Sequence, residues 1–193
     1  MTTWEYIQPK IKALEKGVFN YTLSNMRRSN LEVILNEIDA QEITDMRQVA
    51  YIMATVWNEC RLLSIPEIRA KEGTEVWKAQ ERYWHDGFYG RGFSQLTFKE
   101  NYAKFSPVVG MDLVAEPDLV LLPKVGAKIL VEGMKRGMFT GNKLDQFFVN
   151  GTADWFHARS IVNGIRSILG QSQAKAVAKV AQGIYEIIQH PPL

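Results

Sequence analysis

Apolar residues recur at the spacing of an α-helix along most of the chain, and this periodicity limits the fold more than any other feature. It covers residues 4–14, 31–38, 49–63, 123–137, 154–162 and 172–188. Between Pro66 and Gly92 the pattern breaks, and glycines, aromatic residues and charges mix without a period. The sequence therefore predicts a mostly α-helical domain with a small β-hairpin or irregular insertion near its middle.

Signals for helix ends support this division. A serine, threonine or aspartate before an apolar run starts a helix, proline suits its first position, and glycine or asparagine ends it. The expected starts are Ser29–Glu32, Asp45, Thr97 and Pro123, and the expected ends are Gly17, Gly137 and Asn163–Gly164. Residues 90–97 partly alternate between apolar and polar, which indicates a short strand or hairpin arm.

The size and charge of the chain exclude several classes of protein. With 193 residues, 46% of them hydrophobic, it can bury about 70% of its unfolded surface as one domain over residues 1–193. Its 23 Lys and Arg against 21 Asp and Glu are scattered, unlike the basic face of a nucleic-acid-binding module. We expect a monomer that does not bind nucleic acid.

No segment has the pattern of a membrane anchor or a secretion signal. The longest apolar run, Val49–Ala54, has six residues, whereas a spanning helix needs about 20. Residues 1–5 lack the basic start and apolar core of a signal peptide. We expect cytoplasmic synthesis without stable membrane insertion, so action outside the membrane would require release by another factor.

Glu59 is the residue whose position is most unusual for its type. It lies on the apolar stripe of its helix, three residues after Val56 and four before Leu63. Burial disfavours a charged carboxylate, and a carboxyl group that keeps its proton can act as a general acid. The alternative is a structural glutamate paired with Arg61 or another base.

Glycosidic cleavage usually needs a second carboxylate. Glu67, Glu72 and Glu75 follow in the irregular stretch, where each is either a catalytic partner or a solvated surface residue. The same stretch holds aromatic residues that can pack in a core or stack on sugar rings. These are Trp77, Tyr83, Trp84, Phe88, Tyr89 and Phe93.

No residue pattern indicates a metal or cofactor site. His85, His157 and His190 lie far apart and lack partners at ligand spacing. Cys60, the only cysteine, excludes an internal disulfide and a cysteine-rich metal site, and it is best interpreted as a small buried hydrophobic residue.

One segment resembles a known family. Tyr89–Thr97 reads YGRGFSQLT and is similar to the Tyr-Gly-Arg-Gly-x-x-Gln-Leu-Ser/Thr signature of family 19 glycoside hydrolases. That family comprises chitinases and related phage and prophage endolysins with a lysozyme-like, two-lobed helical fold. Further segments resemble its endolysin branch, and they are residues 50–59, 101–102, 116–119, 133–141 and 161–164. The resemblance covers residues 30–188 and leaves residues 1–29 as an N-terminal helical extension.

The resemblance implies roles for individual residues. Glu59 takes the place of the catalytic acid. Tyr89, Gln95, Thr97 and Asn163 match residues that line the sugar cleft or hold the attacking water. Arg91 matches a structural arginine, and we expect it to tie the hairpin to the helix of the acid.

The chain departs from the family at two places. The family's His-Glu-Thr is Asn58-Glu59-Cys60 here, so the contributions of that histidine and threonine are absent or altered. The base also does not align, because Glu67 lies one place early and Glu72 three places late. We favour Glu72, since Glu67 directly follows Pro66 and is stiffly placed.

The resemblance implies an endolysin-like muramidase that cleaves β-1,4 bonds of the peptidoglycan glycan strand by acid–base catalysis with inversion. It implies no metal or cofactor, and its partner would be peptidoglycan or a chitin-like polysaccharide. Two alternatives remain: a chitinase of the same family, and a non-catalytic cell-wall-binding or virion protein, which the changes at Asn58 and Cys60 favour.

Overall fold

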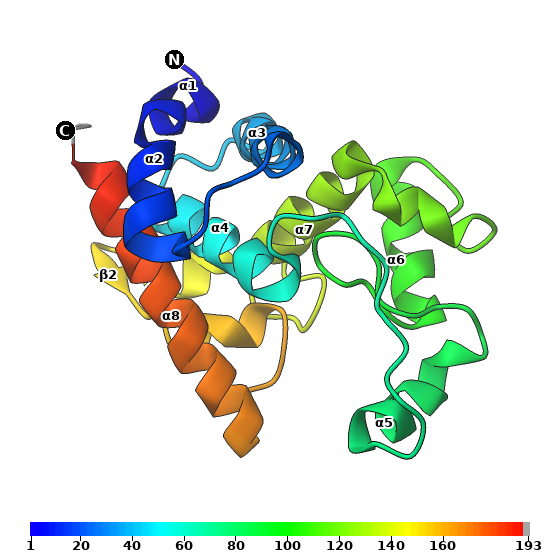
Figure 1. Cartoon of the computed structure of the whole chain (residues 1–193). Coiled ribbons are helices and arrows are strands. Elements are labelled where there is room, and N and C mark those ends of the chain that lie inside the picture. Colours follow the sequence, from blue (N-terminus) through cyan, green and yellow to red (C-terminus); the bar gives the residue numbers. More distant parts are fainter. Residues whose placement is uncertain (191–193) are drawn as a thin grey trace.

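Helices make up most of the structure, a computed structural model that describes residues 1–190 (Figure 1). The α-helices are α1 (Thr3–Ile7), α2 (Ile11–Leu14), α3 (Asn25–Ala40), α4 (Met46–Cys60), α5 (Glu75–Trp84), α6 (Lys99–Val109), α7 (Pro123–Arg136) and α8 (Ile168–Gln189). Short helical segments lie between them. The 3-10 segments are η1 (Gln8–Lys10), η3 (Pro117–Leu121), η4 (Leu144–Gln146) and η5 (His157–Ile161), and η2 (Glu15–Phe19) is a π-helical turn. Strands β1 (Phe148–Val149) and β2 (Thr152–Ala153) pair antiparallel, with Phe148 opposite Ala153. The expected fold class is confirmed.

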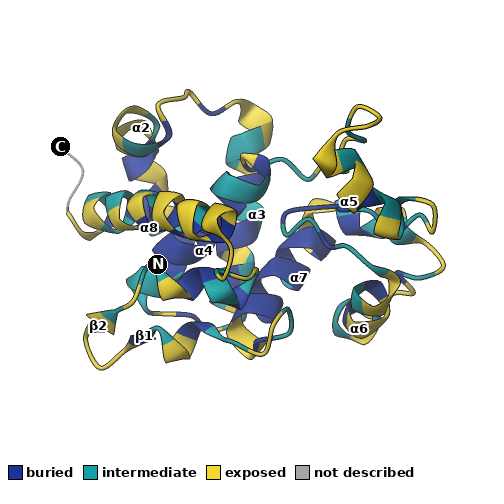
Figure 2. Ribbon diagram, turned by 90° about the horizontal axis from the view of Figure 1, so that it is seen from below, coloured by how far each residue is buried: buried dark blue, intermediate teal, exposed yellow. Residues whose placement is uncertain are grey.

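The centre of the larger lobe is α4, which is buried along almost its whole length (Figure 2). It begins where Asp45 predicts, because the Asp45 side chain accepts a hydrogen bond from the Arg47 N–H. Its apolar residues Val49, Ile52 and Val56 are fully buried, and α8 packs against it. Each such side chain stabilises the fold by about 1.5–3 kcal/mol, so α4 is a rigid base for the residues at its end.

A second, smaller core lies in the lobe that contains α5 and α6. Its buried residues are Phe88, Leu96, Tyr102, Phe105, Leu113, Val120, Val125 and Ile129. Helix α7 contributes to both cores, since Leu130 and Met134 belong to the larger one whereas Val125 and Ile129 belong to the smaller one. The predicted limits of α7, Pro123 and Gly137, are confirmed. The fold is therefore two-lobed, and α7 joins the lobes.

The N-terminal segment differs from the single helix expected over residues 4–14. It divides into α1, η1 and α2, because Pro9 in η1 lacks a backbone N–H for a continuous ladder. Gly17 does not end the helix but lies inside η2, and the left-handed residue that ends it is Asn20. The extension is thus helical but irregular.

Helix α3 begins earlier than the expected Ser29–Glu32 start. Ser24 caps it by accepting from the Arg27 N–H, so the helix is already established at Ser29. Asn30 lies inside the helix, where its buried side chain donates to the Leu62 carbonyl at 2.8 Å. This bond fastens α3 to the segment that follows α4.

The C-terminal region has two further differences. Residues 154–162 form only the short η5, and neither Asn163 nor Gly164 has the positive φ of a left-handed stop. Helix α8 begins at Ile168, four residues before the expected Ser172, because Ser167 caps it. Within residues 1–190, no helix is both long and apolar enough to cross a membrane.

Residues 90–97 form a tight loop rather than a strand. Arg91 makes single bridges to Pro66 and Leu96, and the two-stranded sheet lies elsewhere, at residues 148–153. The chain turns at Gly92, whose φ is +71°, and a Cβ there would lie 2.7 Å from the Val120 carbonyl oxygen. Only glycine fits this contact without displacing the backbone.

Two elements beside this loop also differ from expectation. Thr97 does not cap α6, since its hydroxyl donates to the Gln95 carbonyl and α6 begins at Lys99. The stretch that lacked a period contains α5, which Thr74 caps by accepting from the Trp77 N–H. Gln80 is the one buried residue of α5, and the aromatic residues of this helix remain partly exposed.

Candidate active site

A cavity of about 480 Å³ lies between the two lobes and brings together most of the predicted site residues. Those that line it are Glu59, Glu67, Gln95, Thr97 and Asn163. They come from the end of α4, from the loop 90–97 with its neighbouring segment, and from the turn after η5. Two carboxylates, Glu59 at the end of α4 and Glu67 in the segment that follows it, therefore share one cavity.

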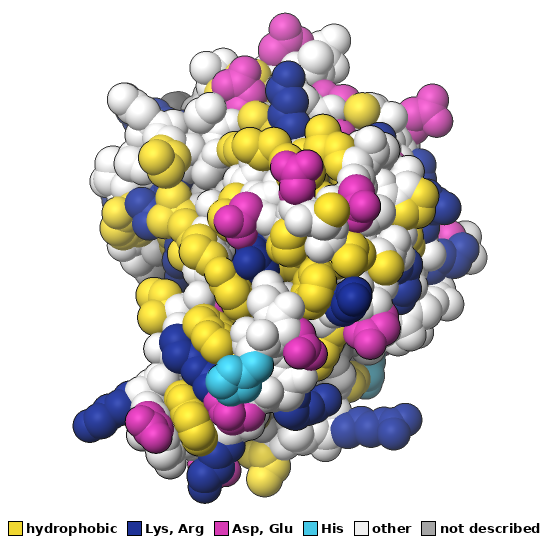
Figure 3. Space-filling view, turned by 90° about the vertical axis from the view of Figure 1, so that its right-hand side faces the viewer, with side chains coloured by type: hydrophobic (Ala, Val, Ile, Leu, Met, Phe, Trp, Pro, Cys, Tyr) yellow, Lys and Arg dark blue, Asp and Glu magenta, His cyan; other side chains and the backbone are white. Residues whose placement is uncertain are grey.

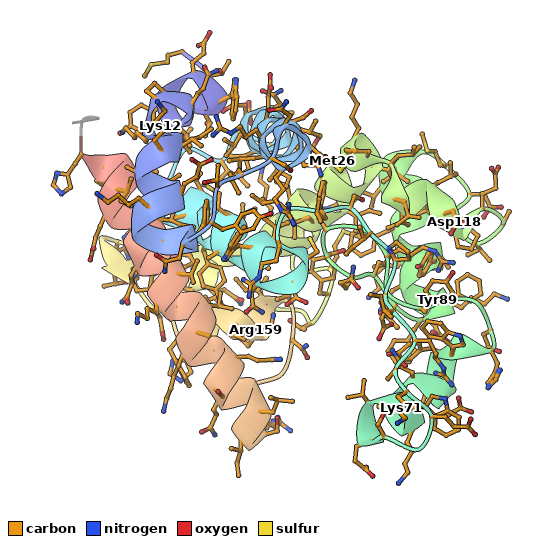
Figure 4. The ribbon with its side chains drawn as sticks, viewed as in Figure 1. Lys12, Met26, Lys71, Tyr89, Asp118 and Arg159 are labelled. Atoms are coloured by element: carbon orange, nitrogen blue, oxygen red, sulfur yellow. The ribbon has the colours of Figure 1, made fainter. Side chains whose placement is uncertain are left out.

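Glu59 occupies the last turn of α4 and is paired with a base. Its Oε1 lies 2.9 Å from a terminal nitrogen of Arg159, although the N–H does not point along this line and the pair has no hydrogen bond. The Glu59 side chain is 20% exposed and the Arg159 side chain 2%. Arg159 lies in the larger lobe, on η5 (Figure 4). The base that pairs with Glu59 is therefore Arg159 rather than Arg61, and the structural alternative allowed either Arg61 or another base.

Polar residues continue from Glu59 back along α4. Tyr51, Thr55 and Glu59 follow at four-residue steps and so share one face of the helix. The hydroxyls of Tyr51 and Thr55 are buried without a hydrogen-bond partner in the described part of the chain. Burial raises the pKa of Tyr51, so its hydroxyl keeps its proton. This face of α4 is polar in an otherwise apolar environment.

Glu67 is held by three hydrogen-bond donors. Gln80 Nε2 and the Tyr83 hydroxyl donate to Oε1 at 2.9 and 3.0 Å, and the Gly90 N–H donates to Oε2 at 3.0 Å. Burial has the larger effect on the pKa of Tyr83, and together with the hydrogen bond to Glu67 it raises this pKa to about 12. The Tyr83 hydroxyl therefore remains a donor at neutral pH. The Glu67 carboxylate is therefore fixed in position at the cavity wall.

The buried Gln80 explains why this segment has a fixed shape. Besides Glu67, its amide donates to the Ile68 carbonyl at 2.9 Å and accepts from the Ala70 N–H at 2.8 Å. The Glu67 N–H donates to the Gly90 carbonyl at 2.7 Å. Helix α5 and the loop 90–97 thus hold the segment around Glu67 from two sides.

Three other predicted residues contribute polar atoms to the cavity. Gln95 Nε2 donates to the Ile65 and Gly92 carbonyls, both at 3.0 Å, which fixes its side chain. Asn163 accepts from the Gly164 N–H through its Oδ1 at 2.9 Å. Thr97 donates to the Gln95 carbonyl at 2.9 Å. These groups can hydrogen-bond to a sugar or to a water.

Four of the predicted residues do not line the cavity, and they are Glu72, Glu75, Tyr89 and Arg91. Tyr89 stacks on Trp84, with ring centroids 4.6 Å apart, and the Arg91 guanidinium covers the Tyr89 ring at 3.8 Å. Glu72 is exposed, and Glu75 pairs with Lys78 on the surface of α5. Of the three candidate partners of Glu59, only Glu67 lines the cavity.

Arg91 is buried and structural, but it does not contact the helix of Glu59. Its guanidinium donates to Asp118 at 2.7 Å, to the Tyr102 hydroxyl at 3.0 Å and to the Gly87 and Tyr89 carbonyls. The loop 90–97 is therefore tied to α6 and η3, within the smaller lobe. The expected link to α4 is wrong because the smaller lobe supplies all of these acceptors.

We expect Arg91→Ala to destabilise the fold by about 1–3 kcal/mol or more, because the buried Tyr102 hydroxyl and the partly buried Gly87 carbonyl lose their donor. A denaturant melt measures this, and a glycan-hydrolysis assay well below the melting midpoint shows the effect on activity. If activity collapses while the midpoint stays unchanged, Arg91 contacts substrate and the structural role is wrong.

Sequence reasoning missed Arg159, Gln80 and Tyr83 as site residues. Tyr83 appeared only as a member of the aromatic cluster, and Gln80 and Arg159 carried no local signal. Cys60 is buried, and burial raises the pKa of its thiol to about 12, as suits a hydrophobic residue. In residues 1–190, no three His, Cys, Asp or Glu side chains are grouped to hold a metal ion.

Charges on the face formed by the smaller lobe are mixed. Acidic and basic side chains are interspersed there, with apolar residues between them (Figure 3). This face does not carry the continuous basic stripe that nucleic-acid binding requires.

The fold is similar to that of a known hydrolase. Chitinase C from Streptomyces griseus HUT6037 superposes with a TM-score of 0.67 and 18% sequence identity, over 100% of this chain and 79% of the chitinase chain. Neither a family model nor a curated protein sequence matches. The similarity shows that the chain has the lysozyme-like helical fold of a chitinase.

Proposed function

We propose that the chain hydrolyses β-1,4 glycosidic bonds of a polysaccharide, with Glu59 as general acid and Glu67 as general base. One observation carries this proposal: two carboxylates, from α4 and from the segment after it, line the same cavity between the lobes. Most glycosidases use two carboxyl groups that flank the scissile bond as their catalytic residues. The fold shared with a chitinase supports the same reaction class.

In this mechanism, Glu59 donates its proton to the oxygen of the leaving sugar and becomes a carboxylate. Arg159, 2.9 Å away and almost fully buried, stabilises the negative charge that forms. Glu59 must regain a proton before the next turnover.

Glu67 accepts a proton from the water that attacks the sugar from the opposite face. Attack on that face inverts the configuration of the anomeric carbon. The three donors around Glu67 keep its carboxylate in one orientation. Gln95, Thr97 and Asn163 supply further polar groups for the sugar and the water.

The polymer that we propose is peptidoglycan. The support comes from the sequence, since its segments over residues 30–188 resemble the endolysin branch of family 19. Chitin is the second candidate, because the structural neighbour is a chitinase. Both polymers have β-1,4-linked N-acetylated sugars, so one cavity can suit either.

Mass analysis of digested polymer tests this proposal. We expect soluble fragments from purified cell walls with a new reducing end at muramic acid, and slower release from chitin oligomers. Faster turnover of chitin oligomers would instead identify a chitinase. Binding to walls without any new reducing ends would identify a wall-binding protein and contradict the proposed hydrolysis.

A further inference from the structure

A second hollow, of about 300 Å³, lies at the end of α4 and shares no residue with the active-site cavity. Its lining residues are Phe19, Asn20, Tyr21, Arg27, Trp57 and Arg61. Four of them belong to residues 1–29, the extension outside the family resemblance. The extension therefore builds a surface feature together with the helix that carries Glu59.

Two arginines in this hollow are held in place yet keep free donors. Arg27 Nε donates to the Arg61 carbonyl at 3.0 Å, and its terminal nitrogen donates to the Tyr21 hydroxyl at 3.2 Å. The Arg61 guanidinium donates one hydrogen bond, to the Trp57 carbonyl at 3.0 Å. A guanidinium has five N–H donors, so most remain available. Neither arginine forms an ion pair with another residue in 1–190.

Aromatic rings support both guanidiniums. The Phe19 and Trp57 rings lie 4.3 Å apart, Arg61 covers the Trp57 ring at 5.0 Å, and Arg27 covers the Tyr21 ring at 4.9 Å. Tyr21 is 48% exposed. Such stacking limits the freedom of the guanidiniums and reduces the entropy lost when a ligand binds.

Positive charge extends beyond the hollow. A neighbouring hollow shares Asn20 and Tyr21 and adds Lys12 and Lys16. Its carboxylate, Glu15, is already neutralised, because it accepts from Arg28 at 2.7 Å and from the Leu23 N–H at 2.9 Å. The surface around Tyr21 therefore favours an anion, and paired guanidinium donors suit a carboxylate.

The backbone at Arg61 is strained. Arg61 ends α4 with a φ of +53°, a position where glycine is the favoured residue. Strain of this kind concentrates at ligand sites. Arginine at this position places a guanidinium over Trp57, which glycine would not.

We propose that this hollow binds the carboxylates of the peptides carried by a glycan strand while the sugars occupy the active-site cavity. This inference rests on the proposed function and narrows its substrate to a peptide-bearing glycan. Trp57 and Glu59 lie on opposite sides of the end of α4, about 200° apart around the helix. A four-residue peptide spans up to about 14 Å, which is comparable with the roughly 10–12 Å diameter of a helix, so its length matches the width of α4.

Calorimetric titration with a free tetrapeptide of sequence L-Ala-D-Glu-L-Lys-D-Ala tests the inference without any glycan cleavage. We expect this peptide to bind the unmodified chain and its fully amidated form to bind about tenfold more weakly, because hydrogen bonds to charged groups are lost. Arg61→Gly and Arg27→Gln should each weaken binding to a similar extent. Arg61→Gly also relieves the strained φ, so its melting temperature should not fall, and this separates binding from folding.

Lys124→Gln is the matched control, since Lys124 is exposed at the start of α7 and the change removes the same charge. Equal binding of the amidated peptide, or an unchanged affinity in both arginine variants, would overturn the inference. Stronger binding of DNA or anionic vesicles with the same arginine dependence would also overturn it. If the peptide binds as expected but walls are not hydrolysed, the proposed function fails and the peptide site remains.

Discussion

Glu59→Gln is expected to lower the rate of glycan hydrolysis by about 10²–10⁴-fold, the usual contribution of a general acid or base. The amide keeps the shape of the side chain but cannot donate a proton of suitable acidity. Glu59 is the carboxylate of α4 that lines the cavity, so no neighbouring acid on that helix can replace it. Release of reducing ends from purified walls measures the loss.

The same variant should also be less stable, because Arg159 is 2% exposed and would lose its counter-charge. Leaving a buried charged group without its partner costs about 3–5 kcal/mol. The assay is therefore made well below the melting temperature of the variant. Glu59→Asp, which keeps the negative charge beside Arg159, is the control for folding. Activity of Glu59→Gln within tenfold of the unmodified chain would remove Glu59 from the mechanism.

The sequence predicted best those elements that bury a regular apolar stripe. Helix α4 has such a stripe, and its start at Asp45 and the position of Glu59 at its end were both found in this way. Helix α7 was located by Pro123 and Gly137, which act through local backbone geometry. In these elements, the residues that determine the structure lie close together in the sequence.

The elements that were missed depend on distant contacts. Helix α5 buries only Gln80, so its amphipathic pattern was hidden among aromatic and charged residues. Arg159 reaches Glu59 through the packing of η5 near α4, a contact between residues 100 positions apart. No local pattern identifies such a pairing, so the sequence could name only the nearby Arg61 or an unspecified other base.

The preference for Glu72 over Glu67 shows the same limit. The sequence disfavours Glu67 because Pro66 makes its backbone stiff. In the structure this stiffness helps, since Pro66 bridges to Arg91 and the backbone of Glu67 bonds to Gly90. A base benefits from a fixed position, because no ordering is required when the reaction begins.

Glu67→Gln should therefore lose about 10²–10⁴-fold in hydrolysis, whereas Glu72→Gln should keep full activity. Glu72 is exposed and lies outside the cavity, so its replacement should change stability by less than about 0.5 kcal/mol. The two variants make the same chemical change within five residues of one another. Their comparison distinguishes a base from a nearby surface charge.

Glu67→Gln carries a stability cost that must be separated from its effect on catalysis. All three groups that hydrogen-bond to the Glu67 carboxylate are donors. In the glutamine variant, one carboxylate oxygen becomes an NH₂ group, which is itself a donor. At least one hydrogen bond is therefore lost, and two donors face each other in its place. We expect a loss of about 1–3 kcal/mol. Tyr83→Phe removes one of these bonds but keeps the carboxylate, so it should lower stability with a much smaller effect on rate. If Tyr83→Phe loses as much activity as Glu67→Gln, the loss reflects the shape of the segment, and Glu67 is not the base.

The anomeric form of the first product, followed by NMR, supplies an independent test of the role of Glu67. Inversion requires a water activated from the opposite face, and retention would instead require a covalent glycosyl intermediate on the second carboxylate.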